Sequence, residues 1–154
     1  GIDDKAIPIS VDATKGLPFA NGYFDLLFTV DAYHYFGDTA EMLPSLIPFV
    51  KKGGCIAVAI PGLKYEFGKN VPDEMKPFWD DEVARTIHSI AWWKDLWSKA
   101  EGIDIVDISE MNCCKQAWDE WLTCPNPYAV SDIKMMEAEG GKYFNLIRLI
   151  AKVI

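Results

Sequence analysis

Residues 6–30, AIPISVDATKGLPFANGYFDLLFTV, contain two apolar runs separated by a segment rich in turn-forming residues. The first run, AIPISV, ends at Asp12, and the second, FDLLFTV, ends at Asp31. Neither run alternates strictly between apolar and polar residues, which is typical of strands covered on both faces in a parallel sheet. Gly16, Pro18 and Gly22 lie between the runs, so this segment is predicted to connect two strands.

Predicted helices and strands alternate along the rest of the chain. Asp38 or Thr39 can cap a helix that reaches Val50, and Ser89 can cap another that reaches Ala100. Three more strands are predicted over residues 55–60, 103–108 and 143–154, and two more helices over residues 115–122 and 131–139. This order predicts an α/β fold with a layered sheet, in which residues 1–154 form a single domain.

Composition argues against several classes of function. The net charge of −8 leaves no surplus of Lys and Arg for the phosphates of a nucleic acid. No apolar run approaches the roughly 20 residues of a membrane-spanning helix, and the N-terminal residues do not resemble a signal peptide. Four cysteines without CxxC spacing and two histidines do not predict a metal site. We therefore expect a cytoplasmic protein that binds no nucleic acid, membrane or metal.

Three ordered motifs resemble those of class I S-adenosylmethionine-dependent methyltransferases of the small-molecule type. Residues 12–25, DATKGLPFANGYFD, are similar to that family's Asp-Ala, Leu-Pro-Phe and Phe-Asp signature. Residues 30–36, VDAYHYF, resemble the exit of the family's fourth strand. Residues 49–54, FVKKGG, resemble its Leu-Lys-Pro-Gly-Gly turn, with Lys52 in place of the usual proline.

The resemblance implies a partial Rossmann-like methyltransferase sheet that contains the third to seventh strands of the family, with an antiparallel last strand. The family's sheet order is three, two, one, four, five, seven, six, and its first glycine-rich motif has no match in this sequence. The chain is therefore expected to be the incomplete C-terminal portion of a methyltransferase domain. Residues 6–11 are expected either to pair directly beside Phe24–Val30 or to leave that edge to another chain, which predicts a homodimer.

The implied activity is transfer of a methyl group from S-adenosyl-L-methionine to an unidentified small-molecule acceptor, impaired in this portion alone. Asp12 and Ala13 would bind the adenine ring through a carboxylate and a backbone N–H. Asp31 and Ala32 would lie at the methionine side of the cofactor. Two alternatives stay open, with Asp12 as the cap of a turn and Asp31 as a buried structural residue.

His34 is the candidate catalytic base, because an imidazole at the exit of the second apolar run can take a proton near neutral pH. The alternative is an aromatic wall without a base, since methyl transfer depends mainly on alignment. The acceptor is expected beside His34 and residues 63–97.

Five tryptophans form either a cage for the substrate or part of the core. They are Trp92, Trp93, Trp97, Trp118 and Trp121. Helical spacing favours the core. A non-catalytic α/β module for binding or assembly is the alternative function of the whole chain.

Overall fold

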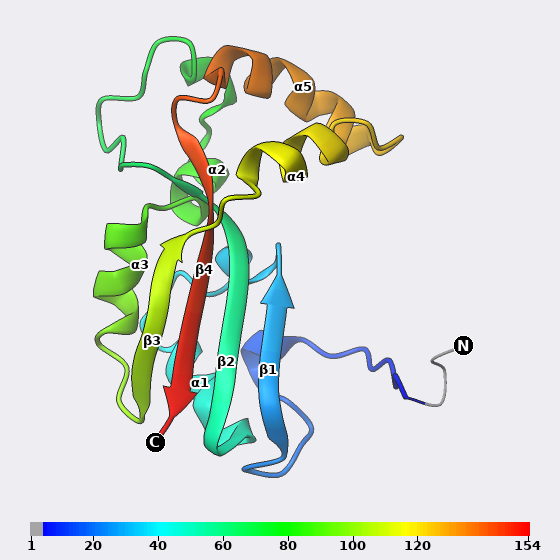
Figure 1. Cartoon of the computed structure of the whole chain (residues 1–154), viewed down its shortest axis with the longest axis vertical. Coiled ribbons are helices and arrows are strands. Elements are labelled where there is room, and N and C mark those ends of the chain that lie inside the picture. Colours follow the sequence, from blue (N-terminus) through cyan, green and yellow to red (C-terminus); the bar gives the residue numbers. More distant parts are fainter. Residues whose placement is uncertain (1–4) are drawn as a thin grey trace.

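A four-stranded mixed sheet runs through the computed structural model, which describes residues 5–154 (Figure 1). Its order is β1 (Phe24–Val30), β2 (Val50–Leu63), β4 (Phe144–Val153) and β3 (Ile103–Glu110). β1 is parallel to β2, and β4 is antiparallel to both of its neighbours. This is the order expected for the fourth, fifth, seventh and sixth strands of the resembled family, so the predicted partial α/β sheet is confirmed.

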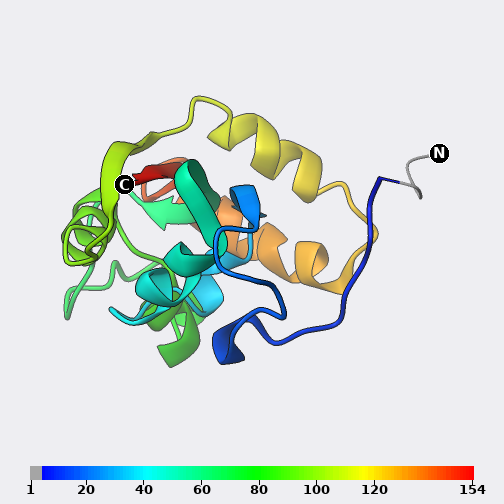
Figure 2. The same ribbon diagram turned by 90° about the horizontal axis from the view of Figure 1, so that it is seen from below.

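The helices lie on one face of the sheet and at one end of it. Figures 1 and 2 show α1 (Met42–Leu46), α2 (Asp81–Thr86) and α3 (Ile90–Trp97) on the face behind the sheet. α4 (Cys114–Trp121) and α5 (Pro127–Glu139) lie beyond the carboxyl ends of β1, β2 and β3, and we call this pair the cap. Short 3-10 helices occupy Ala13–Lys15, Tyr33–Tyr35, Ile47–Phe49 and Lys76–Phe78.

The main core lies between the sheet and the helices behind it. Alternate residues of β2 and β4 face this side, and Ile56, Val58, Ile60, Ile147 and Leu149 are at most 2% exposed. They belong to one apolar cluster with residues of the helical layer: Tyr33, Met42, Leu43, Leu46, Trp93 and Trp97. A period of two along each strand therefore separates a covered face from an open face.

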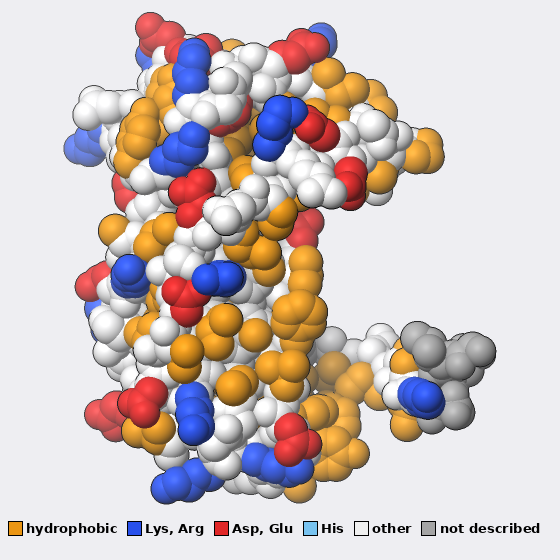
Figure 3. Space-filling model, viewed as in Figure 1, with side chains coloured by type: hydrophobic (Ala, Val, Ile, Leu, Met, Phe, Trp, Pro, Cys, Tyr) orange, Lys and Arg blue, Asp and Glu red, His pale blue; other side chains and the backbone are white. Residues whose placement is uncertain are grey.

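The open face carries large apolar side chains at its β1 edge. Leu26, Phe28 and Val30 are 52%, 64% and 57% exposed. Their partners on β2 are small, and Phe28 and Val30 lie opposite Ala57 and Ala59. Hydrophobic side chains gather over this part of the molecule in Figure 3. Within the described residues, β1 pairs with β2 alone, so its outer edge has no partner strand.

The prediction of a strand over residues 6–11 is wrong. These residues form an extended arm without strand pairing, which points away from β1 in Figures 1 and 2. Ile7, Ile9 and Val11 are 85%, 50% and 44% exposed. Pro8 has no N–H to give to a ladder, and a strand needs a neighbour to satisfy its backbone groups. Direct pairing of this segment beside β1 is therefore also wrong.

The predicted helix from Asp38 or Thr39 to Val50 is shorter than expected. α1 covers Met42–Leu46 and tightens into the 3-10 turn Ile47–Phe49 at Pro48. Asp38 does not cap it, because its carboxylate pairs with Arg85 at 2.7 Å. Proline removes a backbone donor and restricts the residue before it, which explains the early end.

Residues 51–54, which resemble the family's glycine turn, lie inside β2. The pairing register shifts from Phe24 opposite Val50 to Leu26 opposite Cys55, so the intervening residues bulge out of the ladder. Gly53 has a φ of +84° at this bulge, a conformation that glycine adopts without strain.

The remaining predicted elements are confirmed within a few residues of their expected bounds. Ser89 caps α3, because its hydroxyl accepts a hydrogen bond from the Trp92 N–H at 3.3 Å. β3, α4, α5 and β4 cover the expected segments.

Candidate functional site

The carboxyl end of β1 is marked by an unusual backbone conformation. Asp31 follows the strand with a φ of +51°, and it is the only non-glycine residue of the described chain with a positive φ. Its N–H donates to the Ala59 carbonyl at 2.8 Å, which keeps the turn attached to β2. Aspartate tolerates this left-handed region better than most residues. The chain therefore leaves the sheet abruptly at the position where the sequence predicts the methionine side of a cofactor site.

Asp31 lies close to the cap. Its pKa is raised by partial burial and by the nearby carboxylate of Asp132 on α5. Asp132 accepts a hydrogen bond from Trp121 Nε1 of α4 at 2.9 Å. Asp31 is nevertheless exposed, so the alternative of a buried structural residue does not describe it. Ala32 is half-buried and precedes the turn Tyr33–Tyr35.

Asp12 has the geometry of a turn cap. Its carboxylate accepts hydrogen bonds from the Thr14 N–H at 3.0 Å and from the Thr14 hydroxyl at 2.6 Å, and it pairs with Lys15 at 3.1 Å. The Thr14 and Lys15 contacts lower the pKa of Asp12. Ala13, which is half-buried, begins the turn that Asp12 caps. Asp12 therefore caps the turn Ala13–Lys15, as the alternative interpretation predicts. Its role in adenine binding stays a prediction.

One hollow is lined by residues that follow the Asp12 and Asp31 segments in the sequence. A hollow of about 350 Å³ is lined by Thr14, which follows Ala13, and by Tyr35, which lies three residues after Ala32. No hydrogen bond of the described chain joins Asp12 to Asp31 directly. None of the four predicted cofactor residues, Asp12, Ala13, Asp31 and Ala32, lines this hollow, so their role in one cofactor site stays a prediction.

His34 is buried, with 1% of its surface exposed. Burial lowers the pKa of His34 to about 4, so the ring is neutral near pH 7. Its Nδ1 has no hydrogen-bond partner, and the ring packs against Tyr35 with centroids 4.0 Å apart. His34 therefore packs among aromatic side chains, as the alternative interpretation predicts. Catalysis by His34 stays a prediction.

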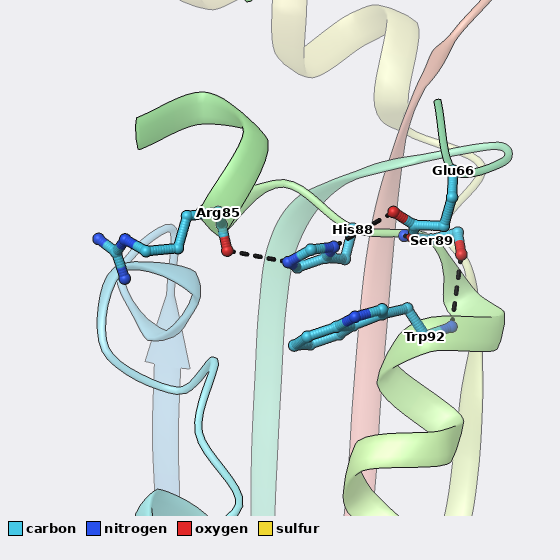
Figure 4. A network of polar contacts seen from close by, with 5 residues as sticks. All are labelled: Glu66, Arg85, His88, Ser89 and Trp92. Carbon is cyan, nitrogen blue, oxygen red and sulfur yellow. Dashed lines mark hydrogen bonds and ion pairs between the residues drawn. The ribbon is translucent and has the colours of Figure 1, made fainter. Parts of the chain in front are cut away.

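No role was predicted for His88, which lies in a network of polar contacts (Figure 4). The Nδ1 atom of His88 lies 3.2 Å from Glu66 Oε2, and its Nε2 atom lies 2.8 Å from the Arg85 carbonyl oxygen. The imidazole ring stacks on Trp92, with ring centroids 3.6 Å apart. Burial alone would raise the pKa of Glu66, but hydrogen bonds from His88 and Ser89 outweigh it and lower that pKa.

This network holds the loop after β2 against the start of α3. Both ring nitrogens of His88 make contacts within the chain, one with Glu66 and the other with the Arg85 carbonyl. His88 and Trp92 are four residues apart, which the sequence shows, but Glu66 lies 22 residues before His88 and gives no local signal.

The five tryptophans do not form one cage. Trp93 and Trp97 are buried in the core, and Trp92 stacks on His88. Trp118 and Trp121 belong to the cap, and no ring contact joins them to the tryptophans of α3. The core interpretation is confirmed for Trp93 and Trp97.

Residues 5–154 contain no group of three or more His, Cys, Asp or Glu side chains arranged to hold a metal ion. In the same part of the chain, no helix has the length and apolar character that crossing a membrane requires.

No protein-family model matches the chain, and no curated protein matches its sequence. Solved structures do match. Geranyl diphosphate C-methyltransferase from Streptomyces coelicolor A3(2), bound to Mg²⁺, geranyl diphosphate and S-adenosyl-L-homocysteine, is 13% identical with a TM-score of 0.65. The match covers 94% of this chain and 52% of that one.

Two further structures extend the comparison. A putative sarcosine dimethylglycine methyltransferase from Galdieria sulphuraria is 13% identical with a TM-score of 0.63, over 88% of this chain and 55% of that one. The [4+2]-cyclase SpnF is 13% identical with a TM-score of 0.59, over 94% of this chain and 54% of that one. The chain spans about half the length of these proteins, and its fold is that of part of a methyltransferase Rossmann-like domain.

Proposed function

We propose that this chain is the C-terminal portion of a methyltransferase domain that transfers a methyl group from S-adenosyl-L-methionine to a small-molecule acceptor. The observation that carries the proposal is the order β1–β2–β4–β3 with an antiparallel β4, in a fold shared with proteins crystallised with SAM or S-adenosyl-L-homocysteine. Open α/β sheets bind ligands beyond the carboxyl ends of their parallel strands. Asp31 and the cap lie at that end of this sheet.

Asp12 and Ala13 are proposed to bind adenine, and Asp31 and Ala32 to line the methionine side. The assignment is supported by Thr14 and Tyr35, which follow these two pairs in the sequence and line the same hollow. The Asp12 carboxylate is exposed and already accepts N–H and O–H donors. The adenine amino group can therefore replace one of these donors without leaving a buried charge unpaired.

When it is bound, S-adenosyl-L-methionine supplies an electrophilic methyl group. The task of the chain's own residues is to orient the acceptor, because a direct displacement depends on the alignment of nucleophile, methyl carbon and sulfur. His34 is buried, so a role as a base requires this side chain to become accessible.

The chain by itself is proposed to bind the cofactor weakly, since it offers only two of the loops that the resemblance implies. Calorimetry with S-adenosylhomocysteine should show weak or undetectable binding, and tight micromolar binding would contradict this. A cytoplasmic location and a homodimer through the β1 edge are parts of the same proposal.

Saturation-transfer difference NMR tests the proposal, because it detects weak ligands. The adenine protons of S-adenosylhomocysteine should receive saturation from the chain, and Asp12→Asn should reduce this signal severalfold. Asp25→Asn is the matched control, since Asp25 is also exposed and paired with a lysine, Lys51, but at the opposite end of β1. Equal loss in both variants, or no signal in the parent chain, would count against the assignment.

One observation favours a second reaction class. SpnF is a [4+2]-cyclase with the same fold, so the fold alone does not specify methyl transfer. Transfer of a labelled methyl group to a small molecule, with this chain present in a complete domain, would separate a methyltransferase from a cyclase or a non-catalytic module.

A further inference from the structure

The arm of residues 5–11 and the outer edge of β1 both lack a strand partner in the described part of the chain. β1 is seven residues long, which is also the length of the arm. In Figures 1 and 2 the arm extends away from the sheet, where another molecule can reach it. Unpaired strand edges recruit further strands. The arm and the β1 edge are therefore candidates to pair with each other between molecules.

The outer edge of β1 presents the backbone groups of its open-face residues. The Asp31 N–H donates to the Ala59 carbonyl of β2 at 2.8 Å, so Asp31 turns its backbone towards β2. Successive residues of a strand turn their N–H and C=O groups to opposite sides. Leu26, Phe28 and Val30 therefore direct theirs outwards. The side chains of the same three residues are exposed on the open face.

The arm carries a matching pattern. Ile7, Ile9 and Val11 recur with a period of two and are exposed. Pro8 lies between the first two and has no N–H to donate. In a strand at the edge of a sheet, a proline is tolerated where its backbone turns away from the neighbouring strand. The three apolar residues then share one face and turn their backbone groups towards that neighbour.

Pro8 selects an antiparallel direction. Directly opposite residues of neighbouring strands have their side chains on the same face of the sheet. In an antiparallel pair, opposite residues turn their backbone groups towards each other or both away, so the apolar residues of the arm can bond to Phe28 and its outward-facing neighbours. In a parallel pair, the residue opposite Phe28 turns away from β1, and Pro8 would face β1 without a donor. Only the antiparallel direction suits both the apolar pattern and Pro8.

Charge complementarity selects the same direction. Antiparallel pairing brings Lys5, at the start of the arm, to the carboxyl end of β1, where Asp31 is exposed. Neither residue forms an ion pair with another described residue. Parallel pairing would instead place Asp12, which follows the arm, beside Asp31, and like charges opposite each other destabilise a pair. A second copy of this chain carries both halves of the match.

We propose that the arm of one copy adds to the β1 edge of a second copy as an antiparallel strand, and that reciprocal exchange of the arms closes a two-fold dimer. This inference rests on the homodimer in the proposed function and names its contact, but it does not depend on methyl transfer. The register that places Ile7 opposite Phe28 leaves Asp12 beyond the start of β1. The register that places Ile9 there would set Asp12 opposite Asp25, so the first is expected.

Sedimentation velocity of the 154-residue chain tests the proposal, with a reducing agent because Cys113 and Cys124 are exposed. The parent chain should dimerise. Ile9→Pro removes an N–H that donates to β1 and should raise the dissociation constant about tenfold, the scale of one hydrogen bond. Ser10→Pro is the matched control, because the Ser10 N–H faces away from β1. It should change the constant by less than about twofold.

Isotope-filtered NOEs in a mixture of ¹³C-labelled and unlabelled chains test the direction of pairing. The Ile7 methyl groups should show intermolecular cross-peaks to the Phe28 ring. Lys5→Glu should raise the dissociation constant roughly two- to fivefold, because it replaces an exposed ion pair with Asp31 by a repulsion.

A monomeric parent chain would overturn the proposal, as would an effect of Ser10→Pro equal to or larger than that of Ile9→Pro. Cross-peaks from Val11 to Val30 in place of those from Ile7 to Phe28 would overturn the antiparallel direction and with it the proposal. A dimer that Phe28→Lys weakens but Ile9→Pro does not would keep the homodimer and overturn the exchange of arms. Saturation transfer to S-adenosylhomocysteine tests the cofactor proposal separately from all of these results.

Discussion

β2 and β4 each have a neighbouring strand on both sides, whereas within the described residues β1 has a neighbour on one side and the arm of residues 5–11 has none, although all of these segments are rich in apolar residues. β2 and β4 face each other from Cys55–Lys152 to Leu63–Phe144, over the core. β1 has one neighbour, and the arm has none among the described residues. The difference shows that β propensity selects candidates for strands, while a neighbouring strand and a covering layer determine which of them are buried.

Two matched leucine substitutions should show the largest effect. Leu149 on β4 is fully buried, and Leu26 on β1 is 52% exposed. Leu149→Ala should lower the free energy of unfolding by about 2–5 kcal/mol, because it leaves a cavity in the core. Leu26→Ala should cost less than about 1 kcal/mol. Urea unfolding measures both, and a Leu26→Ala cost equal to that of Leu149→Ala would mean that the open face is covered in solution.

Lowering the pH should destabilise the folded chain through His34. Because burial lowers the pKa of His34 to about 4, from 6.5, the unfolded chain binds a proton more readily than the folded chain does. The free energy of unfolding should therefore fall by up to about 3 kcal/mol as the pH falls from 6.5 towards 4. His34→Phe should flatten this part of the pH profile. An unchanged profile in the variant would show that His34 is exposed to solvent.

The bare edge of β1 should make the chain self-associate. Sedimentation velocity should show dimers that increase with concentration, and Phe28→Lys should raise the dissociation constant about tenfold or more by placing a charge on this edge. Val106→Lys is the control, since Val106 is 62% exposed on the opposite edge strand. A parent chain that stays monomeric at high concentration would contradict the proposed homodimer.

The smallest effect should come from the contact that holds the loop of residues 64–79 to the start of β4. The Tyr143 hydroxyl donates to Glu74 Oε1 at 2.7 Å, and this contact together with Lys142 lowers the pKa of Glu74 to about 2. The contribution to stability is therefore present above about pH 4.5 and is lost as the pH falls towards 2. Glu74→Gln should be less stable than the parent near pH 6, and the two unfolding curves should converge near pH 2.

Strands that form long apolar runs between turn signals could be predicted from sequence. That holds for β1, which has one neighbouring strand, as well as for β2 and β4, which have two. Residues 6–11 show the same local pattern, but they form a strand only if another strand pairs with them, and the local sequence does not show whether one does. The shortened α1 reflects its prolines, whose effect on a helix end is known only to within a turn.

Candidate site residues could be predicted from sequence where they directly follow a predicted strand. Asp31 lies at the end of β1 as expected, and Asp12 caps a turn, the alternative that the sequence left open. The Glu66–His88 contact could not be predicted, because it depends on how distant segments pack. Trp118 illustrates this, since its spacing shows a helix but not the missing partner of its N–H.

Amide chemical-shift mapping with S-adenosylhomocysteine tests the central claim most directly, that the loop after residue 12 and the loop after β1 form one cofactor site. At millimolar ligand, the ¹⁵N-labelled chain should show shifts concentrated at the amides of Thr14, Lys15 and the turn Tyr33–Tyr35. The amides near Gly102, at the opposite end of the sheet, should not move. Shifts confined to that opposite end, or no shifts at all, would contradict the account.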